Sequence, residues 1–229
     1  DYFGPKRPGG ILVWGANPAI SGADGELQWF IKDAVNEGIP IVVVDPKPTE
    51  LARKAKLWLR VRPGTDGALA LGILNLLFTE DLYDHDFVER YTYGFEELRA
   101  RCRDYPPDKV AAITGIPASQ ILAAARWIGT TKPLGLEQGC AFEQSVNAMD
   151  TCRAIFMIPA VTGNYDVPGG FVESMEIVPA GLRPANELPP ERIEKALTGG
   201  VPFLKRDTMA HPYLMLEAIR TGKPYKIRG

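Results

Sequence analysis

The chain has 229 residues, with 26 Lys plus Arg, 28 Asp plus Glu and a formal net charge of −2 at pH 7. This balance gives no electrostatic reason to expect nucleic acid or a membrane surface as a partner. Hydrophobic residues make up 45% of the chain, which excludes a disordered or collagen-like protein. No apolar run reaches the roughly 18 residues that a membrane span needs. We therefore expect a globular protein without direct membrane insertion.

Alternation of strands and helices is the main pattern of the first part. Continuous apolar runs predict strands at 11–14 and 39–44, and a third strand is expected at 57–61. A helix over 25–36, capped by Asp24, and a short helix over 49–56 separate them. Strands that are apolar at every position are typical of a parallel sheet covered on both faces.

Helices dominate the middle of the chain. The pattern predicts a helix from Thr65 or Asp66 to Phe78, and further helices over 84–103, over 117–128 behind Thr114, and over 147–161 with a bend at Pro159. A weak strand at 134–136 completes the set. The prediction is an open, mostly parallel, Rossmann-like α/β sheet with helices on both faces.

The last part of the chain differs from the rest in composition. Gly and Pro number 23 and 20, nearly a fifth of the chain against about 12% on average, and they are densest after Gly163. We place a boundary near Gly170, with an α/β domain over 1–170 and a loop-rich connecting segment over 171–229. Short helices are expected near 191–197 and 213–220, and a strand from Tyr225. The ends at Asp1 and Gly229 suggest an internal fragment of a longer polypeptide.

Cysteine and histidine are sparse. The three cysteines, Cys102, Cys140 and Cys152, form no CxxC pair, and the two histidines, His85 and His211, are far apart. The sparse cysteines and histidines therefore predict no metal site in this chain. Cys140 has no histidine near it in sequence, so a buried structural thiol is the preferred interpretation.

Polar residues gather where strands end, which is where open parallel sheets bind ligands. Gly15 and Asn17 follow the first strand, where a glycine permits close approach of a ligand and an amide offers a donor and an acceptor. The segment from Asp45 to Thr49 follows the second strand. Its carboxylate suits a ribose and its lysine a phosphate, and its residues are Asp45, Pro46, Lys47, Pro48 and Thr49. The alternative in both places is an ordinary turn.

Two further segments are candidates. Gly64, Thr65 and Asp66 follow the third strand, and the Asp66 carboxylate matches the paired N–H donors of guanine. Its alternative is a helix N-cap. Cys140 and the neutral amide Gln144 follow the fourth strand. There is no GxGxxG, which argues against a nicotinamide dehydrogenase.

These motifs, in this order, resemble the molybdopterin oxidoreductases of the DMSO reductase family. The resemblance covers residues 10–171 and rests on Trp14-Gly15-Ala16-Asn17-Pro18, Val43-Val44-Asp45-Pro46-Lys47, Arg62-Pro63-Gly64-Thr65-Asp66, Phe87-Val88-Glu89-Arg90-Tyr91, and Thr162-Gly163-Asn164 with Pro168-Gly169-Gly170. Such enzymes hold molybdenum or tungsten between two molybdopterin guanine dinucleotides. The chain departs from the family at Ser145, where relatives often have histidine, and at Asp166, where they have glycine.

The resemblance implies a role for each candidate residue. Gly15 and Asn17 would contact the dinucleotide, the segment 45–49 its ribose and phosphates, the segment 64–66 its guanine, and Cys140 and Gln144 the pterin side. The metal ligand and any iron–sulfur cluster would belong to the longer parent, so this fragment alone should be inactive. Its partners would be the rest of the same polypeptide and electron-transfer subunits, in the cytoplasm or periplasm of a prokaryote. The alternative is a stand-alone nucleotide-binding or regulatory module without catalysis.

Overall fold

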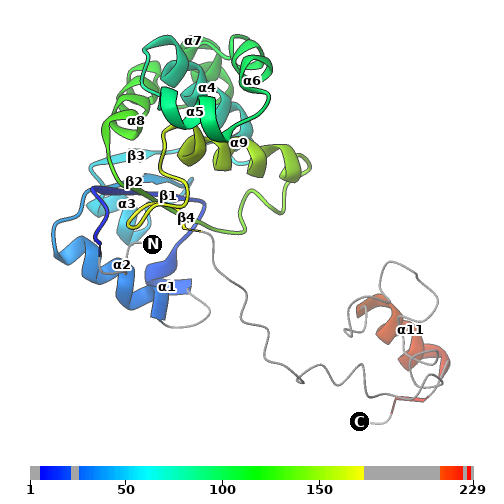
Figure 1. The fold of residues 1–229 in the computed structure, drawn as a ribbon. Coiled ribbons are helices and arrows are strands. Elements are labelled where there is room, and N and C mark those ends of the chain that lie inside the picture. The colour runs from blue at the N-terminus through cyan, green and yellow to red at the C-terminus, as the bar shows by residue number, and fades with distance from the viewer. Residues whose placement is uncertain (1–5, 22–25, 173–211, 224–225, 228–229) are drawn as a thin grey trace. The chain divides into compact units, whose positions relative to one another are not determined.

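The computed structural model describes residues 6–21, 26–172, 212–223 and 226–227 (Figure 1). The chain divides into two compact units, residues 1–174 and 175–229. The expected cap at Asp24 and the expected helix near 191–197 lie outside the described residues.

A four-stranded, fully parallel sheet forms the centre of the first unit. Its strands are β1 (Gly10–Trp14), β2 (Ile41–Val44), β3 (Leu57–Leu59) and β4 (Leu134–Gln138), in the order β3-β2-β1-β4. In this register Ile11 lies opposite Ile41 on one side and Gly135 on the other. The predicted open parallel α/β sheet is confirmed. From β1 the chain adds β2 and then β3 on one side of the sheet, and it adds β4 on the other side of β1. The strand order therefore reverses between β1 and β4. Such a reversal creates the ligand crevice of these folds.

The two central strands, β1 and β2, are buried at every position, as their continuous apolar runs predict. Ile11 and Val13 of β1 point into a small core with Ile31 and Ala34. This core lies under α1 (Pro18–Ser21), α2 (Glu26–Asn36) and α3 (Glu50–Lys54). The alternate residues face the larger helical layer, so side chains of one strand serve two cores.

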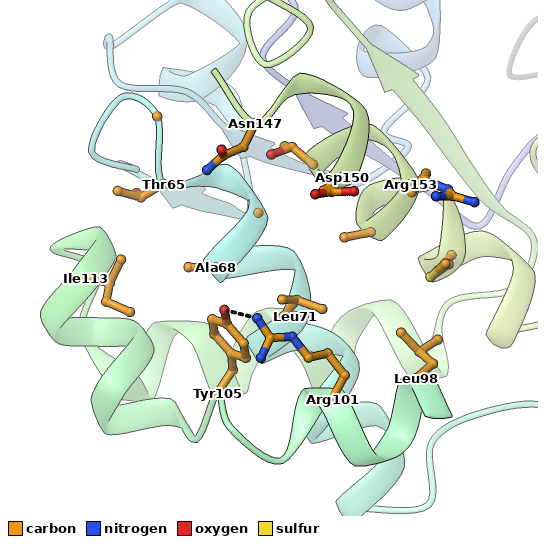
Figure 2. Close-up of a pocket in the computed structure, with 15 residues that line it drawn as sticks. Thr65, Ala68, Leu71, Leu98, Arg101, Tyr105, Ile113, Asn147, Asp150 and Arg153 are labelled. Carbon is orange, nitrogen blue, oxygen red and sulfur yellow. Dashed lines mark hydrogen bonds between the residues drawn. The ribbon is translucent and has the colours of Figure 1, made fainter. Parts of the chain in front are cut away.

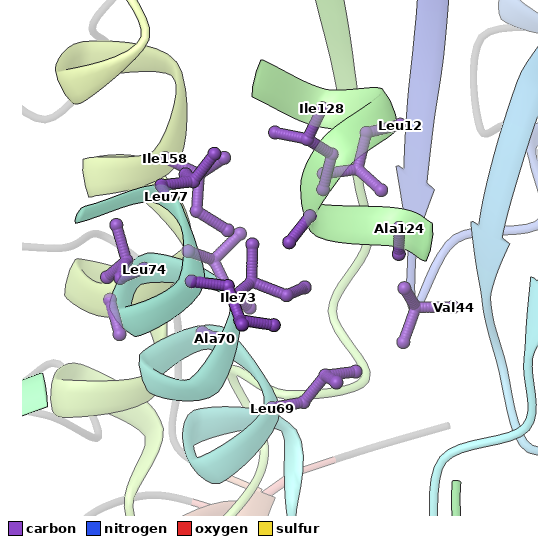
Figure 3. Packing of buried hydrophobic residues seen from close by; sticks show 14 of the residues in the cluster. Leu12, Val44, Leu69, Ala70, Ile73, Leu74, Leu77, Ala124, Ile128 and Ile158 are labelled. Carbon is purple, nitrogen blue, oxygen red and sulfur yellow. The ribbon is translucent and has the colours of Figure 1, made fainter. Parts of the chain in front are cut away.

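The larger core lies between the sheet and the remaining helices (Figure 3). Leu12 and Val44 from the strands meet Leu69 and Ile73, which belong to a helix hydrophobic on nearly every side. That helix is α4 (Asp66–Thr79), and it is surrounded by α8 (Ala118–Thr130) and α9 (Ala148–Val161), among others. Burial on all sides explains why α4 carries so few polar residues.

The helix expected over 84–103 is two helices, α5 (His85–Tyr91) and α6 (Phe95–Cys102). Gly94 separates them with a left-handed backbone at φ 79°. Glycine adopts this conformation without the Cβ clash that other residues meet, so the break is set locally even though the flanking residues favour a helix.

One helix was missing from the sequence prediction. α7 (Pro107–Thr114) begins directly after Pro106, with Pro107 at a first-turn position. Thr114 ends this helix, and its hydroxyl donates to the Val110 carbonyl at 2.8 Å. Its expected role as the N-cap of α8 is therefore wrong, since Pro117 occupies that position.

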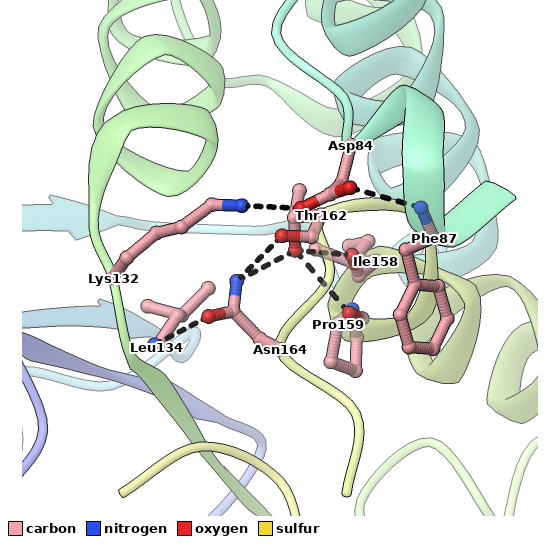
Figure 4. Close-up of polar contacts among 8 residues, drawn as sticks. All are labelled: Asp84, Phe87, Lys132, Leu134, Ile158, Pro159, Thr162 and Asn164. Carbon is pink, nitrogen blue, oxygen red and sulfur yellow. Dashed lines mark hydrogen bonds and ion pairs between the residues drawn. The ribbon is translucent and has the colours of Figure 1, made fainter. Parts of the chain in front are cut away.

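The Thr162-Gly163-Asn164 motif has a structural role (Figure 4). Asn164 is 1% exposed, and its amide oxygen accepts a hydrogen bond from the Leu134 backbone N–H at 2.9 Å. Its amide nitrogen donates to the Thr162 hydroxyl at 2.8 Å. A buried N–H at the start of β4 is thereby satisfied by a residue beyond α9, which fixes β4 to that helix.

Asp84 forms a second polar connection in the same region (Figure 4). Its carboxylate accepts from the Phe87 backbone N–H at 3.0 Å, which caps α5, and from Lys132 Nζ at 2.8 Å. The hydrogen bond from Lys132, with a further contribution from the Phe87 N–H, lowers the pKa of Asp84 below its usual value.

We expect Asp84→Asn to remove the ion pair and keep most of the cap, lowering the free energy of unfolding by about 0.5–1 kcal/mol at pH 7. Because the pKa of Asp84 is lower in the folded than in the unfolded protein, the ion pair stabilises the fold fully at pH values above the unfolded pKa near 3.8. It is lost as the pH falls through the folded pKa. Urea unfolding of both proteins from pH 7 to pH 3 measures the difference, with the exposed Asp108→Asn as control. A difference that grows toward acid pH would contradict this assignment.

The second unit contributes one described helix, α11 (Pro212–Thr221), close to the helix expected at 213–220. Lys226 and Ile227 are not in a strand, so the strand expected from Tyr225 is not found at the described positions. Among the described residues, no helix combines the length and apolar character needed to cross a membrane.

Candidate functional site

The carboxyl ends of all four strands lie along one edge of the sheet, because the strands are parallel. The segments predicted from sequence follow these ends. Asn17 comes after β1, Asp45 after β2 and Asp66 after β3, while Cys140 comes after β4. The fold therefore places the four predicted segments along a single edge.

Gly15 and Gly139 bring the loops after β1 and β4 into backbone contact. Gly15 has φ 58°, and a Cβ on it would lie 3.0 Å from the Ala141 Cβ. A Cβ on Gly139 would lie 2.3 Å from the Gly15 carbonyl oxygen. The space at the Gly15 Cα is thus taken by the neighbouring loop, and the glycine serves this contact within the protein.

Two buried amide oxygens at this edge have no hydrogen-bond partner among the described residues: Asn17 Oδ1 and Gln138 Oε1. Asn17 was predicted as a site residue, whereas Gln138 was missed. It ends β4 and pairs with Trp14 at the point where the strand order reverses. Its sequence signal was only a polar residue ending a short apolar strand, which many core strands share.

Asp45 is 9% exposed and closes a turn after β2. Its Oδ1 accepts from the Lys47 backbone N–H at 2.7 Å, which is an Asx-type turn. The second oxygen has no partner in the described part of the chain. Lys47 is exposed, and Thr49 caps α3 by accepting from the Ala52 N–H at 3.1 Å. The turn therefore leaves one carboxylate oxygen, and the Lys47 ammonium, for a ligand.

Asp66 is bonded to the core through Trp14. The indole Nε1–H donates to Asp66 Oδ1 at 2.9 Å, and Trp14 is fully buried. Thr65 is the N-cap residue of α4, so the interpretation of Asp66 as the N-cap is wrong. The Thr65 hydroxyl instead donates to the Arg62 carbonyl at 2.7 Å. Asp66 is half-buried in the first helical turn, where the helix dipole favours its negative charge.

A cavity of about 670 Å³ borders the third segment (Figure 2). It lies between the start of α4, α6, α7 and α9. Leu71 and Ile113 contribute apolar side chains to its lining, and Arg101 of α6 and Asp150 of α9 contribute charged ones from opposite sides. Gly64 and Thr65 line this cavity. Arg101 is held there by Tyr105, whose hydroxyl accepts from its guanidinium at 3.2 Å.

The loop after β4 differs from its prediction. Cys140 is exposed, so the expectation of a buried structural thiol is wrong. Phe142 is the buried side chain of this loop, at 1% exposure. The buried thiol is Cys102, and burial raises its pKa to about 12. Gln144 is exposed near Cys140, and its backbone N–H donates to the Cys140 carbonyl at 3.2 Å. Within the described ranges, no group of three or more His, Cys, Asp or Glu side chains could hold a metal ion.

Comparison with known proteins identifies the family. The model of the family described as "Molybdopterin oxidoreductase" matches residues 8–225. The chain belongs to the molybdopterin oxidoreductase family. It is 32% identical over 226 residues to the acetylene hydratase of Syntrophotalea acetylenica, a match that covers 86% of this chain and 31% of that protein. It is also 32% identical over 184 residues to the dimethyl sulfoxide reductase DmsA of Escherichia coli, covering 70% of this chain and 22% of the relative.

A solved member of the family has the same fold. The structure of the acetylene hydratase from Pelobacter acetylenicus matches with a TM-score of 0.65 and 30% identity, covering 96% of this chain and 34% of that one. The chain thus spans about a third or less of the length of these relatives. The family resemblance read from the strand-end motifs is confirmed, and a molybdenum or tungsten pterin cofactor follows from it. Asp166, one of the two positions at which the sequence was expected to depart from the family, has a left-handed φ of 54°.

Proposed function

We propose that the carboxyl edge of the sheet binds the guanine dinucleotide half of a molybdopterin cofactor carrying molybdenum or tungsten. The observation that carries this proposal is the Asn17 Oδ1 at the β1–β4 reversal, which is buried and has no hydrogen-bond partner among the residues that the structure describes. Leaving such an acceptor unpaired destabilises a protein by about 1–3 kcal/mol, and a hydroxyl or amino donor on a ligand would remove that penalty. The unpaired acceptor therefore fits a nucleotide, which carries hydroxyl and amino donors.

Each predicted segment has a part in this proposal. Asn17 accepts a hydrogen bond from the dinucleotide, and Asp45 takes a ribose hydroxyl on its remaining oxygen. Lys47 lies near a phosphate, and Asp66 accepts from the guanine. The exposed Cys140 and Gln144 lie on the pterin side. The cofactor, when bound, supplies two-electron transfer at its metal, while this chain holds and orients it.

The whole protein would be a two-electron oxidoreductase, and this chain would be one part of it. Because the chain covers about a third or less of its relatives, we propose that the metal ligand comes from another part of the polypeptide. On this proposal the chain is inactive alone and works with the rest of that polypeptide and with electron-transfer subunits. Any iron–sulfur cluster would lie in the rest of the polypeptide.

Two measurements test the proposal. The whole protein, purified without a metal-binding tag and hydrolysed in acid, should release GMP in proportion to its molybdenum or tungsten. Chromatography measures the GMP and elemental analysis measures the metal. The cofactor-free chain should bind GDP more tightly than ADP in calorimetry. GDP binding by a protein that never acquires pterin or metal would favour the stand-alone nucleotide-binding module instead.

A further inference from the structure

We propose that Gln138 reads the guanine base, by accepting a hydrogen bond from the exocyclic amino group next to Asp66. This inference rests on the proposed function, because it assigns a further specificity residue to the same site. Three observations lead to it: the face of the sheet on which Gln138 lies, its position beside Trp14 on the neighbouring strand, and the unpaired oxygen of its side chain.

The strand register places Gln138 on the helical face of the sheet. Side chains alternate along a strand, and Leu134 and Leu136 of β4 belong to the larger core. Gln138 shares their parity, and its pairing partner is Trp14, which belongs to the same core. Gln138 and Trp14 therefore end neighbouring strands on one face.

Trp14 brings Asp66 to this position. Neighbouring strands lie about 4.8 Å apart, so the Gln138 side chain starts next to the indole. The indole N–H holds Asp66 Oδ1 at 2.9 Å. One buried tryptophan thus connects an amide from β4 with a carboxylate from α4, although the two residues are far apart in the sequence.

The unpaired oxygen shows that the protein alone does not complete this arrangement. Gln138 Oε1 is buried and has no partner in the described part of the chain, and most buried side-chain polar atoms in proteins have one. A glutamine retained for packing alone would be better replaced by a methionine of similar shape. An acceptor that waits for a ligand donor accounts for the glutamine.

Guanine supplies the matching donors. Its edge carries N1–H and an amino group with two hydrogens. A carboxylate has about four acceptor positions, and Trp14 occupies one on Asp66. Asp66 then takes N1–H and one amino hydrogen, and Gln138 Oε1 takes the other amino hydrogen. Hypoxanthine keeps N1–H but lacks the amino group, so inosine nucleotides lose the amino contacts with both Asp66 and Gln138 and keep the bond from N1–H to Asp66. The change in the GDP-over-IDP preference on substituting Gln138 then isolates the Gln138 contact.

The test is calorimetric titration of the cofactor-free chain with GDP, IDP and ADP. Replacing Gln138 with methionine (Gln138→Met) should lower the GDP-over-IDP preference about fivefold, the effect of one hydrogen bond, and leave IDP affinity unchanged. The melting temperature of the ligand-free variant should stay the same or rise, because a buried unpaired acceptor is removed. Leu136→Met on the same face of β4 is the matched control and should keep the preference.

The outcomes separate the two proposals. If the unmodified chain prefers GDP over ADP but Gln138→Met keeps the full GDP-over-IDP preference, the role of Gln138 is overturned and the proposed function stands. If the unmodified chain does not prefer GDP over ADP, the proposed function fails. Should Gln138→Met not fold, Gln138→Glu decides, since it keeps an oxygen acceptor: it should retain the GDP-over-IDP preference, and losing it would overturn the inference.

Discussion

Asp66→Asn, introduced into the whole polypeptide of which this chain is a part, is expected to lower its cofactor content at least tenfold. A carboxylate facing guanine accepts from N1–H and from the amino group, and each such charge-assisted bond contributes roughly 1.5–3 kcal/mol. Asparagine replaces one acceptor oxygen with an N–H donor that would face a donor of the base. The loss of about 1.4 kcal/mol or more corresponds to a factor of ten in binding.

The fold should tolerate this substitution. Asparagine still offers an oxygen to the Trp14 indole, and Asp66 is not the N-cap of α4, so only its favourable interaction with the helix dipole is lost. That interaction is worth about 0.3–1 kcal/mol. Metal and GMP content per chain, measured together with the melting temperature, tests the prediction. Asp86→Asn, in the first turn of α5, makes the same charge change and should leave the cofactor content unaltered. An Asp66→Asn protein with full cofactor content would remove Asp66 from the guanine site.

Gly139→Ala is expected to cost about 3 kcal/mol of unfolding free energy, the upper end for overpacking a tight contact. The added methyl group would lie 2.3 Å from the Gly15 oxygen and 2.8 Å from the Ala16 Cα. Both neighbours are backbone atoms of the loop directly after the buried strand β1, so they cannot rotate away as a side chain would. For a protein of this size the melting temperature should fall by roughly 6–12 °C.

Gly135→Ala is the matched control on the same strand. Its added methyl group would meet Ile11 Cγ1 at 3.7 Å and only carbonyl oxygens at 3.8 Å, which are ordinary contacts. Alanine also loses less conformational freedom on folding than glycine, so this variant should be about as stable as the original protein. Equal melting temperatures for the two variants would show that the loops after β1 and β4 can move apart easily.

The sheet could be predicted from sequence because its two central strands carry strong signals of their own. Ile11 to Trp14 and Ile41 to Val44 are apolar at every position, which burial on both faces requires. The helix boundaries around Gly94 and Thr114 were harder. A glycine inside a helical pattern and a threonine between two apolar stretches each allow more than one reading, and tertiary packing selects between them.

The site was predictable as a set of strand ends but not as a set of contacts. Asn17, Asp45 and Asp66 were predicted as site residues because parallel topology places the carboxyl ends together. The bond between Trp14 and Asp66 depends on how α4 crosses the sheet, and the position of Gln138 depends on which strand lies beside β1. Neither is encoded in local residue patterns. The exposure of Cys140 was missed for the same reason, since Phe142 fills the interior in its place.

The dependence of β4 on Asn164 has a consequence for the order of events during synthesis. β1 and β4 are separated by about 120 residues, which a ribosome adds in roughly 6–24 s at 5–20 residues per second. The first three strands can therefore pair while β4 does not yet exist. When β4 emerges, its Leu134 N–H still lacks the Asn164 oxygen until 30 more residues have followed. The strand that carries Gln138 is thus the last of the four to be synthesised, and its connection through Asn164 comes later still.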